Sequence, residues 1–198
     1  MIKFNNLSND LPYLAFKRMY DKSLKAKQKK IEAVCISSYS KKFDEVNSRF
    51  VNLKFINDKE FIFFSNYESP KSQEFKSHSQ ITAVFYWSSI NVQIRMKALI
   101  QQTSTKFNSE YFLHRDQKKN ALAISSDQST PIRSYKDVER RYLNSLKLDN
   151  LRKCPSKWGG YSFTPYYFEF WEGQESRVNK REVFNNIDGI WKHSFLQP

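Results

Sequence analysis

The sequence predicts an α+β fold in which helices surround an antiparallel β-barrel or sheet. Six or more segments show the alternation or the short apolar runs of strands, and most follow one another as hairpins would. Helical periodicity is confined to a few separate segments. The first of only four glycines is Gly159, so no Gly-rich turn of a dinucleotide-binding fold or a P-loop can precede it. These observations favour a hairpin-linked sheet over a doubly wound fold.

The chain opens on a predicted amphipathic helix with a basic surface. Asp10 is a candidate N-cap and Pro12 suits the first turn; the apolar face is formed by Tyr13, Phe16, Tyr20 and Leu24. The segment from residue 17 to 30 holds seven basic residues and one acid. We interpret it as the solvated face of a helix docked on the domain, because no recognition motif accompanies it. A nucleic-acid or acidic-membrane surface is the alternative.

The strands and the remaining helices then alternate along the chain. Predicted strands cover Ile31–Ser37, Arg49–Ile56, Glu60–Ser65, Gln80–Trp87, Val92–Gln102, Tyr161–Trp171, Arg181–Asn185 and Gly189–Phe195. The turn Asn57-Asp58 joins the second and third of these into a hairpin. Predicted helices cover Ser69–His78, with Ser69 as N-cap and Pro70 in first position, Thr105–Leu113 and Tyr135–Leu148. Without an internal repeat or a low-complexity linker, residues 1–198 are expected to form one domain.

Composition excludes several classes of function. The 198 residues carry 33 Lys+Arg against 20 Asp+Glu, a formal net charge of +13, and 39% hydrophobic residues, enough for a packed core. No apolar stretch reaches the length of a membrane span, and the N-terminus lacks the apolar region of a secretory signal, so we expect a cytoplasmic protein. Two cysteines and three scattered histidines predict neither a disulfide framework nor a metal site.

Several polar residues stand out within the predicted strands. Arg49 and Lys54 lie five residues apart on one predicted strand, and this odd spacing predicts that their side chains point to opposite faces. Lys71 opens a predicted helix, where an anion would also meet free backbone amides. Gln93 and Arg95 alternate with apolar residues; a half-buried Gln suits the edge of a heterocycle, but both side chains could simply face water.

An aromatic strand followed by cations marks the C-terminal part. Trp171 ends the aromatic run and a turn leads to Arg177, Lys180 and Arg181. An aromatic face beside guanidinium groups suits a flat anionic ring system. The alternative is an aromatic core strand followed by a solvated basic strand.

These features occur in the order and spacing of a known family. The motifs are RFVNLK at 49–54, FFSN at 63–66, SPK at 69–71, Gln93, Gln128-Ser129, WGG at 158–160, FEFWEG at 168–173 and RVNKR at 177–181. Over nearly its whole length the chain resembles the pyridoxamine 5′-phosphate oxidases. The resemblance implies a split β-barrel of the FMN-binding type, with the basic helix in residues 1–30 and the barrel in residues 31–198. It also implies a homodimer with FMN at the subunit interface, and no nucleic-acid or membrane partner.

The resemblance also assigns residues to roles. The FMN contacts would be Arg49, Phe50, Val51, Asn52, Leu53, Lys54, Phe64, Ser65, Lys71, Gln93, Gln128, Ser129, Trp171 and Arg181. The contacts to a phosphorylated pyridine-type substrate would be Lys54, Tyr111, Arg115, Lys119, Arg177 and Asn179. Of these, Arg177 and Asn179 would lie at the catalytic position, with Arg177 covering the substrate ring at the flavin face.

Three positions depart from the family pattern. Pro70 stands where the family usually has a phosphate-binding Arg, Lys119 where it has a substrate-phosphate Ser, and Asn179 where it has a substrate-contacting His.

The leading hypothesis is an FMN-dependent oxidase that converts pyridoxamine or pyridoxine 5′-phosphate to pyridoxal 5′-phosphate and passes the electrons to dioxygen. The alternatives are a related FMN oxidase with another ring substrate, of the phenazine-pathway type, and a flavin-binding protein with little turnover.

Overall fold

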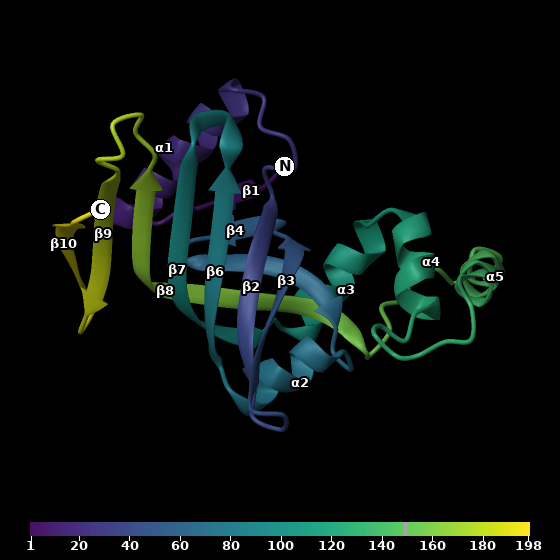
Figure 1. Cartoon of the computed structure of the whole chain (residues 1–198). Helices are drawn as coiled ribbons and strands as arrows, with labels where there is room; N and C mark the ends of the chain where they lie inside the picture. The colour runs from purple at the N-terminus through teal and green to yellow at the C-terminus, as the bar shows by residue number, and fades with distance from the viewer. Residues whose placement is uncertain (149) are drawn as a thin grey trace.

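A single mixed sheet with helices around it forms the core of the computed structural model, which describes residues 1–148 and 150–198 (Figure 1). Along the main path of the sheet the strand order is β1-β4-β5-β8-β7-β6-β2-β3, and β9 and β10 extend it beyond β8. All the pairs are antiparallel except β1 (Lys3–Asn5) with β4 (Phe55–Asn57). The predicted α+β class is therefore confirmed.

Strand β8 (Trp158–Glu172) connects the two halves of the sheet. It pairs with β5 (Glu60–Asn66) through its first residues, with β7 (Val92–Gln102) along most of its length and with β9 (Lys180–Ile187) through its last residues. The register with β7 shifts between Lys97 and Ala98, where a bulge bends the strand. Figure 1 shows the result: β8 turns sharply and passes from one part of the sheet to the other.

The predicted strand Arg49–Ile56 is wrong, because two strands divide this segment. Strand β2 (Ala33–Ser40) forms a hairpin with β3 (Glu45–Asn52), and the chain then turns before it enters β4. At the turn the Leu53 amide donates to the Glu32 carbonyl and the Lys54 amide donates to the Ile62 carbonyl. These two bonds attach the turn to separate neighbours, so the chain changes direction there.

Other strands match their predictions closely. The predicted bounds of β6 (Gln80–Trp87) and β7 are the observed ones, and a short 3₁₀ turn (Ser88–Ile90) joins them. The predicted hairpin around Asn57-Asp58 is formed by β4 and β5. Strands β8, β9 and β10 (Ile190–Leu196) extend one to three residues beyond the predicted bounds at one or both ends. Strand β1, which has only three residues, was not predicted.

The helices show where local pattern fails. Helix α1 (Leu11–Lys25) buries Tyr13, Phe16 and Tyr20 but leaves Leu24 42% exposed, so the predicted apolar face stops one turn early and the helix ends well before residue 30. Helices α2 (Pro70–Ser77) and α3 (Thr105–His114) lie as predicted, and α5 (Tyr135–Ser145) ends before Leu148. Helix α4 (Gln117–Ser125) was not predicted.

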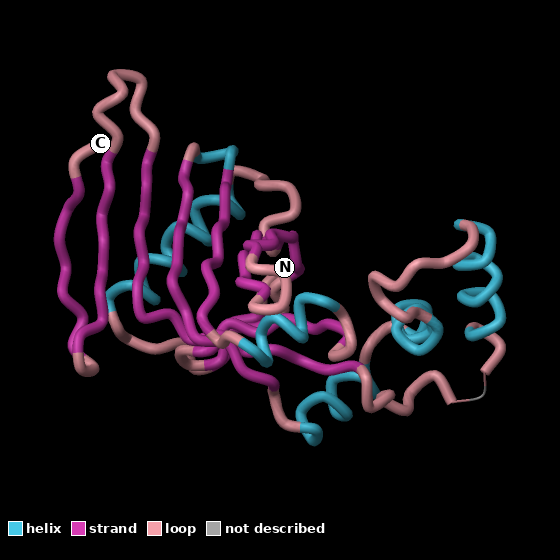
Figure 2. Tube along the Cα trace, turned by 60° about the horizontal axis from the view of Figure 1, so that its bottom comes forward, coloured by secondary structure: helices cyan, strands magenta, loops and turns pink. Residues whose placement is uncertain are grey.

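One hydrophobic core runs from α1 through the inner faces of the strands. Phe16 makes edge-to-face contacts with Phe61 and Phe85 there, which fixes α1 against the sheet. In Figure 2, α4 and α5 stand apart from the strands on the far side of a loop region. Of the helices in the described residues, none combines the length and the apolarity that crossing a membrane requires.

Candidate functional site

A cavity of about 840 Å³ opens between strands β3 and β5 and helices α2, α3 and α4. The residues that the resemblance assigned to FMN or substrate and that line it are Arg49, Phe50, Val51, Asn52, Lys54, Phe64, Ser65, Lys71, Tyr111, Arg115, Lys119, Gln128 and Ser129. The prediction that Arg49 and Lys54 face opposite ways is wrong. Because the chain turns between β3 and β4, both side chains line this cavity.

Lys71 gives one part of the cavity its charge. It opens α2 and is only 8% exposed, and its Nζ donates to Ser65 Oγ at 3.1 Å and to Ser69 Oγ at 3.2 Å. Among the described residues no carboxylate forms an ion pair with it. Burial, reinforced by the charge of Arg49 and opposed by that of Glu74, lowers the pKa of Lys71 to about 8. A buried ammonium with only hydroxyl partners is well suited to receive an anion.

Arg49 is the second cation in this part of the cavity, and its guanidinium is held in place. Its Nη2 lies 2.8 Å from Oε2 of Glu74, a buried carboxylate on α2, and its Nη1 donates to Ser38 Oγ on β2. Glu74 also accepts bonds from Ser38 and Asn47. Helix α2 and strand β2 thus hold the Arg49 guanidinium beside Lys71.

A separate group of cations lies elsewhere along the cavity wall. Burial lowers the pKa of Lys54, and the nearby charges of Lys119 and Arg115 lower it further, although Glu32 opposes them. Burial likewise lowers the pKa of Arg115. Within the described residues none of these three cations forms an ion pair with a carboxylate. Because the charges of Lys119 and Arg115 lower the pKa of Lys54, these three cations share one neighbourhood, whereas the cation that lowers the pKa of Lys71 is Arg49.

Aromatic rings form the wall beside these cations. The rings of Phe64 and Tyr111 are stacked at 4.0 Å between centroids, and the Trp158 ring lies nearly parallel to both, 5.0 Å from Phe64 and 6.3 Å from Tyr111. The guanidinium of Arg115 lies 5.0 Å from the Trp158 centroid, and its Nη1 donates to Asn120 Oδ1 at 3.0 Å. The arginine is therefore oriented without being neutralised.

The loop after α4 brings Gln128 and Ser129 to the cavity. Gln128 Oε1 accepts long bonds from Ser65 Oγ and from the Asn66 amide, each at 3.4 Å. Ser129 has φ = 67°, a left-handed conformation that costs a non-glycine residue energy and is frequent at functional sites. Lys157 Nζ anchors the loop by a 2.7 Å bond to Asp127.

Three residues predicted to contact FMN form a row on another part of the sheet. Gln93 on β7 lies directly opposite Trp171 on β8, and Trp171 lies directly opposite Arg181 on β9. Directly opposed residues share a face of the sheet. None of the three lines the cavity. Leu53 does not line it either, since its side chain is buried in the hydrophobic core.

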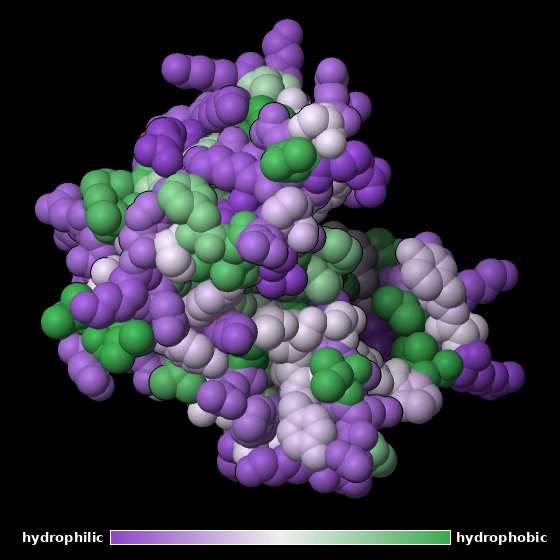
Figure 3. All heavy atoms as spheres, turned by 60° about the vertical axis from the view of Figure 1, so that its left-hand side comes forward, coloured by the Kyte–Doolittle hydropathy of each residue, from purple (hydrophilic) through white to green (hydrophobic). Residues whose placement is uncertain are grey.

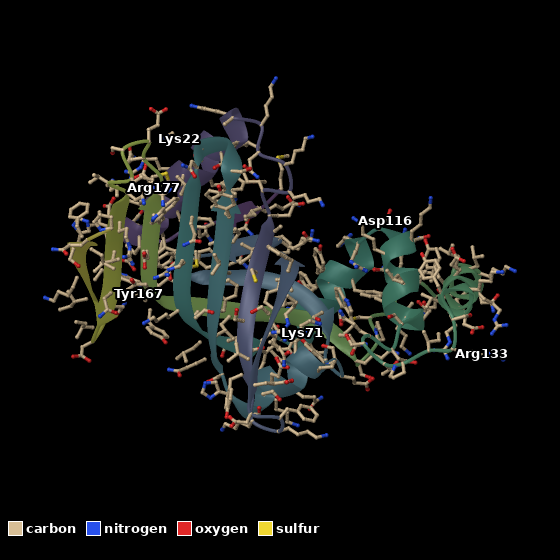
Figure 4. All side chains as sticks on the ribbon, in the orientation of Figure 1. Lys22, Lys71, Asp116, Arg133, Tyr167 and Arg177 are labelled. Carbon is tan, nitrogen blue, oxygen red and sulfur yellow. The ribbon has the colours of Figure 1, made fainter. Side chains whose placement is uncertain are left out.

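The two residues predicted for the catalytic position lie in the β8–β9 loop. Arg177 has φ = 65°, and Asn179 Oδ1 accepts a 3.1 Å bond from the Gln174 amide, which closes the loop on itself. Figure 4 labels Arg177 near the end of β8, at the base of this loop and well away from Lys71 on α2. One copy of the chain therefore divides the predicted site residues between two separate regions.

Several residues that line the cavity had no predicted role, and they include Trp158, Asn66 and Asp116. Trp158 belongs to the WGG motif, which is part of the family resemblance, but the resemblance assigned no contact to this tryptophan. The glycine after it explains the motif: a Cβ on Gly159 would lie 2.1 Å from the Tyr67 hydroxyl oxygen. Asp116 caps α4 by accepting a bond from the Lys119 amide, and α4 itself was not predicted.

The donor set of the cavity fits a phosphorylated cofactor such as FMN. The buried ammonium of Lys71 lacks a carboxylate partner among the described residues, and the serine hydroxyls beside it can turn to donate hydrogen bonds to phosphate oxygens. Arg49 adds a second, oriented charge. By contrast, no three His, Cys, Asp or Glu side chains of the described residues lie together as a metal site requires.

Comparison with known proteins places these residues in context. Residues 158–198 match the family model described as the pyridoxine 5′-phosphate oxidase C-terminal dimerisation region. The chain is 30% identical over 191 residues to pyridoxine/pyridoxamine 5′-phosphate oxidase 1 of Hydrogenovibrio crunogenus, covering 94% of this chain and 88% of that one. It is also 30% identical over 190 residues to the corresponding oxidase of Neisseria meningitidis, covering 96% and 90%.

Solved structures share the fold. PhzG from Burkholderia lata 383, in complex with tetrahydrophenazine-1-carboxylic acid, matches with a TM-score of 0.89 at 21% identity, over 94% of this chain and 92% of that one. A pyridoxamine 5′-phosphate oxidase-related, FMN-binding protein from Nostoc punctiforme matches with a TM-score of 0.75 at 12% identity, over 97% and 99%. At these identities the likeness shows a common architecture, and it confirms the split-barrel type that the sequence predicts.

Proposed function

The chain belongs to the pyridoxine/pyridoxamine 5′-phosphate oxidase family, and from that premise we propose that it is an FMN-dependent oxidase of pyridoxamine or pyridoxine 5′-phosphate. Its product would be pyridoxal 5′-phosphate, with dioxygen as the electron acceptor. FMN, when bound, supplies the transfer of two electrons from the substrate carbon. The residues of the chain bind FMN and the substrate, orient them and polarise them.

The observation that carries this proposal is the presence of two separate cation groups in one cavity. Lys71 and Arg49 form one, and Lys54, Arg115 and Lys119 form the other. An oxidase of this kind must hold two phosphorylated molecules at once, and each phosphate needs its own basic group. The first group would hold the FMN phosphate and the second the substrate phosphate.

The second group also bears on the substrate. Three cations without a carboxylate partner among the described residues match a phosphate, which carries nearly two negative charges at neutral pH, better than a carboxylate, which carries one. Lys119, which departs from the family pattern, adds to this charge. The pyridine ring would lie near the stacked wall of Phe64, Tyr111 and Trp158.

The row of Gln93, Trp171 and Arg181 would complete the flavin site. The Gln93 amide can both donate to and accept from a heterocycle edge, and the Arg181 guanidinium would stabilise negative charge on the reduced ring. Because Asn179 does not titrate near neutral pH, it cannot store a substrate proton as a histidine could.

We infer that a second copy supplies this row, so that each site is built from two chains. The matched family model is a dimerisation region, and the C-terminal hairpin within it exposes Ile190, Phe195 and Leu196. Figure 3, which brings forward the side of the molecule that carries β9 and β10 in Figure 1, shows hydrophobic residues among hydrophilic ones. The edge strand β3 exposes Val46 and Phe50 as well. Such apolar side chains on a monomer are typical of a surface that another chain covers.

The proposal is tested by recording the flavin absorbance spectrum of the purified protein and then adding substrate. We expect the purified protein to bind FMN and to be bleached without oxygen by pyridoxamine 5′-phosphate. On readmission of oxygen it should form hydrogen peroxide. A protein that binds FMN but is bleached only by tetrahydrophenazine-1-carboxylic acid, the compound bound to PhzG, would instead belong to the phenazine type, and one bleached by neither would be a flavin-binding protein with little turnover. Failure to bind FMN would contradict the proposal altogether.

A further inference from the structure

A carboxylate on β8 is buried among cations and has no part in the function proposed above. Glu169 is only 1% exposed. Its Oε1 accepts from Arg181 Nε at 2.9 Å and lies 2.9 Å from Arg181 Nη2, while its Oε2 accepts from Tyr167 Oη at 3.0 Å and from Arg95. A charge this deeply buried is stable only with such partners.

The register of the sheet explains why Glu169 reaches Arg181. Glu169 and Trp171 are two residues apart on β8 and so share a face, and Trp171 is directly opposite Arg181. The carboxylate therefore lies diagonally across from Arg181, one row below the row of Gln93, Trp171 and Arg181. Figure 4 shows the neighbouring Tyr167 on the same part of the sheet as the β8–β9 loop, far from Lys71.

The bonds occupy part of the guanidinium and leave the rest free. Nε donates to Glu169 Oε1 and Nη1 donates to the Gln197 carbonyl at 3.0 Å, while Nη2 is in ion-pair contact with the same Glu169 oxygen. A guanidinium has five N–H donors, so three make no hydrogen bond to the described residues and can meet a ligand. Without these bonds the long Arg181 side chain would sample several rotamers, and a ligand that binds it would have to overcome the entropic cost of fixing one of them.

The charge of Glu169 persists at neutral pH. Burial by itself would raise the pKa of its carboxyl, but Arg181, Tyr167 and Arg95 together hold the pKa below its ordinary value. Arg95, on the strand opposite, gives the carboxylate a second cation, so that Arg181 is oriented while the cluster keeps a net positive charge.

We propose that Glu169 is a positioning residue for the flavin site: it fixes the Arg181 guanidinium in the orientation in which its free N–H groups meet FMN. This inference rests on the proposed function, since it requires that FMN binds and that Arg181 contacts it. Glu169 itself contacts neither flavin nor substrate, and it acts only through Arg181.

A double-mutant cycle on FMN affinity tests the proposal. Apoprotein of the wild type, Glu169→Gln, Arg181→Ala and the double variant is titrated with FMN, and quenching of flavin fluorescence gives each dissociation constant. Glu169→Gln should weaken FMN binding about tenfold, the scale of one charge-assisted hydrogen bond. The double variant should bind within about twofold of Arg181→Ala alone, because the two residues act as a unit. Losses that multiply would mean that Glu169 acts independently of Arg181, and would overturn the proposal.

Two further variants separate positioning from folding. Glu169→Asp keeps the charge but withdraws the carboxylate by one methylene, so it should retain the melting temperature of the apoprotein better than Glu169→Gln and still weaken FMN binding. Glu182→Gln is the matched control: Glu182 is the next residue on β9 and pairs with Lys180 and His193, and its loss should leave FMN affinity within twofold.

The outcomes distinguish this inference from the proposed function. A wild-type protein that does not bind FMN would sink both. A wild-type protein that binds FMN, with Arg181→Ala weakened but both Glu169 variants unchanged, would overturn the positioning role alone. Unchanged affinity in Arg181→Ala would also overturn it, because Glu169 would then have nothing to position.

Discussion

At the scale of single residues, Lys71 gives the clearest dependence on pH. Its pKa in the folded protein is about 8, against an ordinary value of 10.5 in an unfolded chain. Between these values the unfolded chain binds a proton that the folded protein does not, so the stability of the apoprotein rises with pH across this window and is independent of Lys71 titration below it.

We therefore expect Lys71→Met to stabilise the apoprotein at pH 7, by about 2 kcal/mol, because it removes a buried charge. The advantage should shrink as the pH rises from 8 to 10.5. Urea unfolding of both proteins at several pH values measures the difference. A constant difference across that range would mean that Lys71 does not titrate as its burial requires.

The same ammonium predicts how FMN affinity depends on pH. FMN would bind the protonated Lys71, so affinity should fall about tenfold per pH unit above pH 8, until the higher pKa of Lys71 in the complex is reached. In Lys71→Met the affinity should be weaker at pH 7 and nearly flat from pH 7 to 9. Fluorescence titrations at each pH test this, and a wild-type affinity that does not change above pH 8 would contradict it.

Substitution of two arginines should distinguish the residues that bind FMN from those that support turnover. Arg49 is fixed by Glu74 beside Lys71, so Arg49→Ala should deplete the purified protein of FMN. Arg177 lies in the β8–β9 loop, and Arg177→Ala should lower kcat far more than it weakens FMN binding. FMN content and steady-state kinetics of the two variants provide the comparison. Equal losses of both quantities in Arg177→Ala would show that its assigned position is wrong.

At the scale of elements, α1 is fastened by aromatic side chains rather than by its charges. Phe16 is fully buried and contacts Phe61, Phe85 and Trp87, whereas Leu14, on the same helix, is 44% exposed. The side chain of Asp10 adds a polar attachment: it accepts from Trp191 Nε1 on β10 at 3.1 Å and pairs with Lys59. The first and last parts of the chain are thereby joined.

Phe16→Ala should therefore lower the free energy of unfolding by about 3–5 kcal/mol, the cost of a cavity in an aromatic core. Leu14→Ala, the matched control, should cost less than about 1 kcal/mol. Urea denaturation followed by tryptophan fluorescence gives both values. Similar small losses in the two variants would mean that α1 is not docked on the sheet.

At the scale of the whole molecule, the division of the site between two regions makes a prediction about subunits. The Lys71 cavity and the Arg181 row lie apart in one chain, so a site that uses both needs two copies. If Lys71→Met and Trp171→Ala each abolish activity alone, an equal mixture of the two variant proteins that is unfolded and refolded together should recover about one quarter of wild-type activity. Half of the randomly assembled dimers are mixed, and each mixed dimer holds one intact site.

Peroxide formation by the refolded mixture, compared with each variant refolded alone, measures this recovery. Light scattering on the same samples reports the mass. No recovery from a mixture that forms dimers would show that each site is built within one chain, and a protein that stays monomeric would contradict the composite site directly.

Local pattern and family resemblance together determined the class of fold and most of the strands. Strands β6 and β7 have their predicted bounds because alternating apolar residues and a turn mark both ends. Helix α4 was missed because its segment has little apolar periodicity and depends on a buried contact, the bonds of Asn120 to the Phe112 and Leu151 carbonyls. The segment 49–56 has strand propensity throughout, and only its long-range partners divide it into β3 and β4.

The residue types of the candidate site could also be read from the sequence, because motifs are local. Which of them share a cavity, how far the pKa of Lys71 falls and which carboxylate orients Arg181 were decided by the tertiary structure. Cavity walls, burial and cross-strand register all arise from contacts between residues distant in sequence, and local propensity carries no information about them. Glu169 illustrates the difference: it belongs to a motif that was recognised, but its role became visible only when three strands brought Arg95, Tyr167 and Arg181 to its carboxylate.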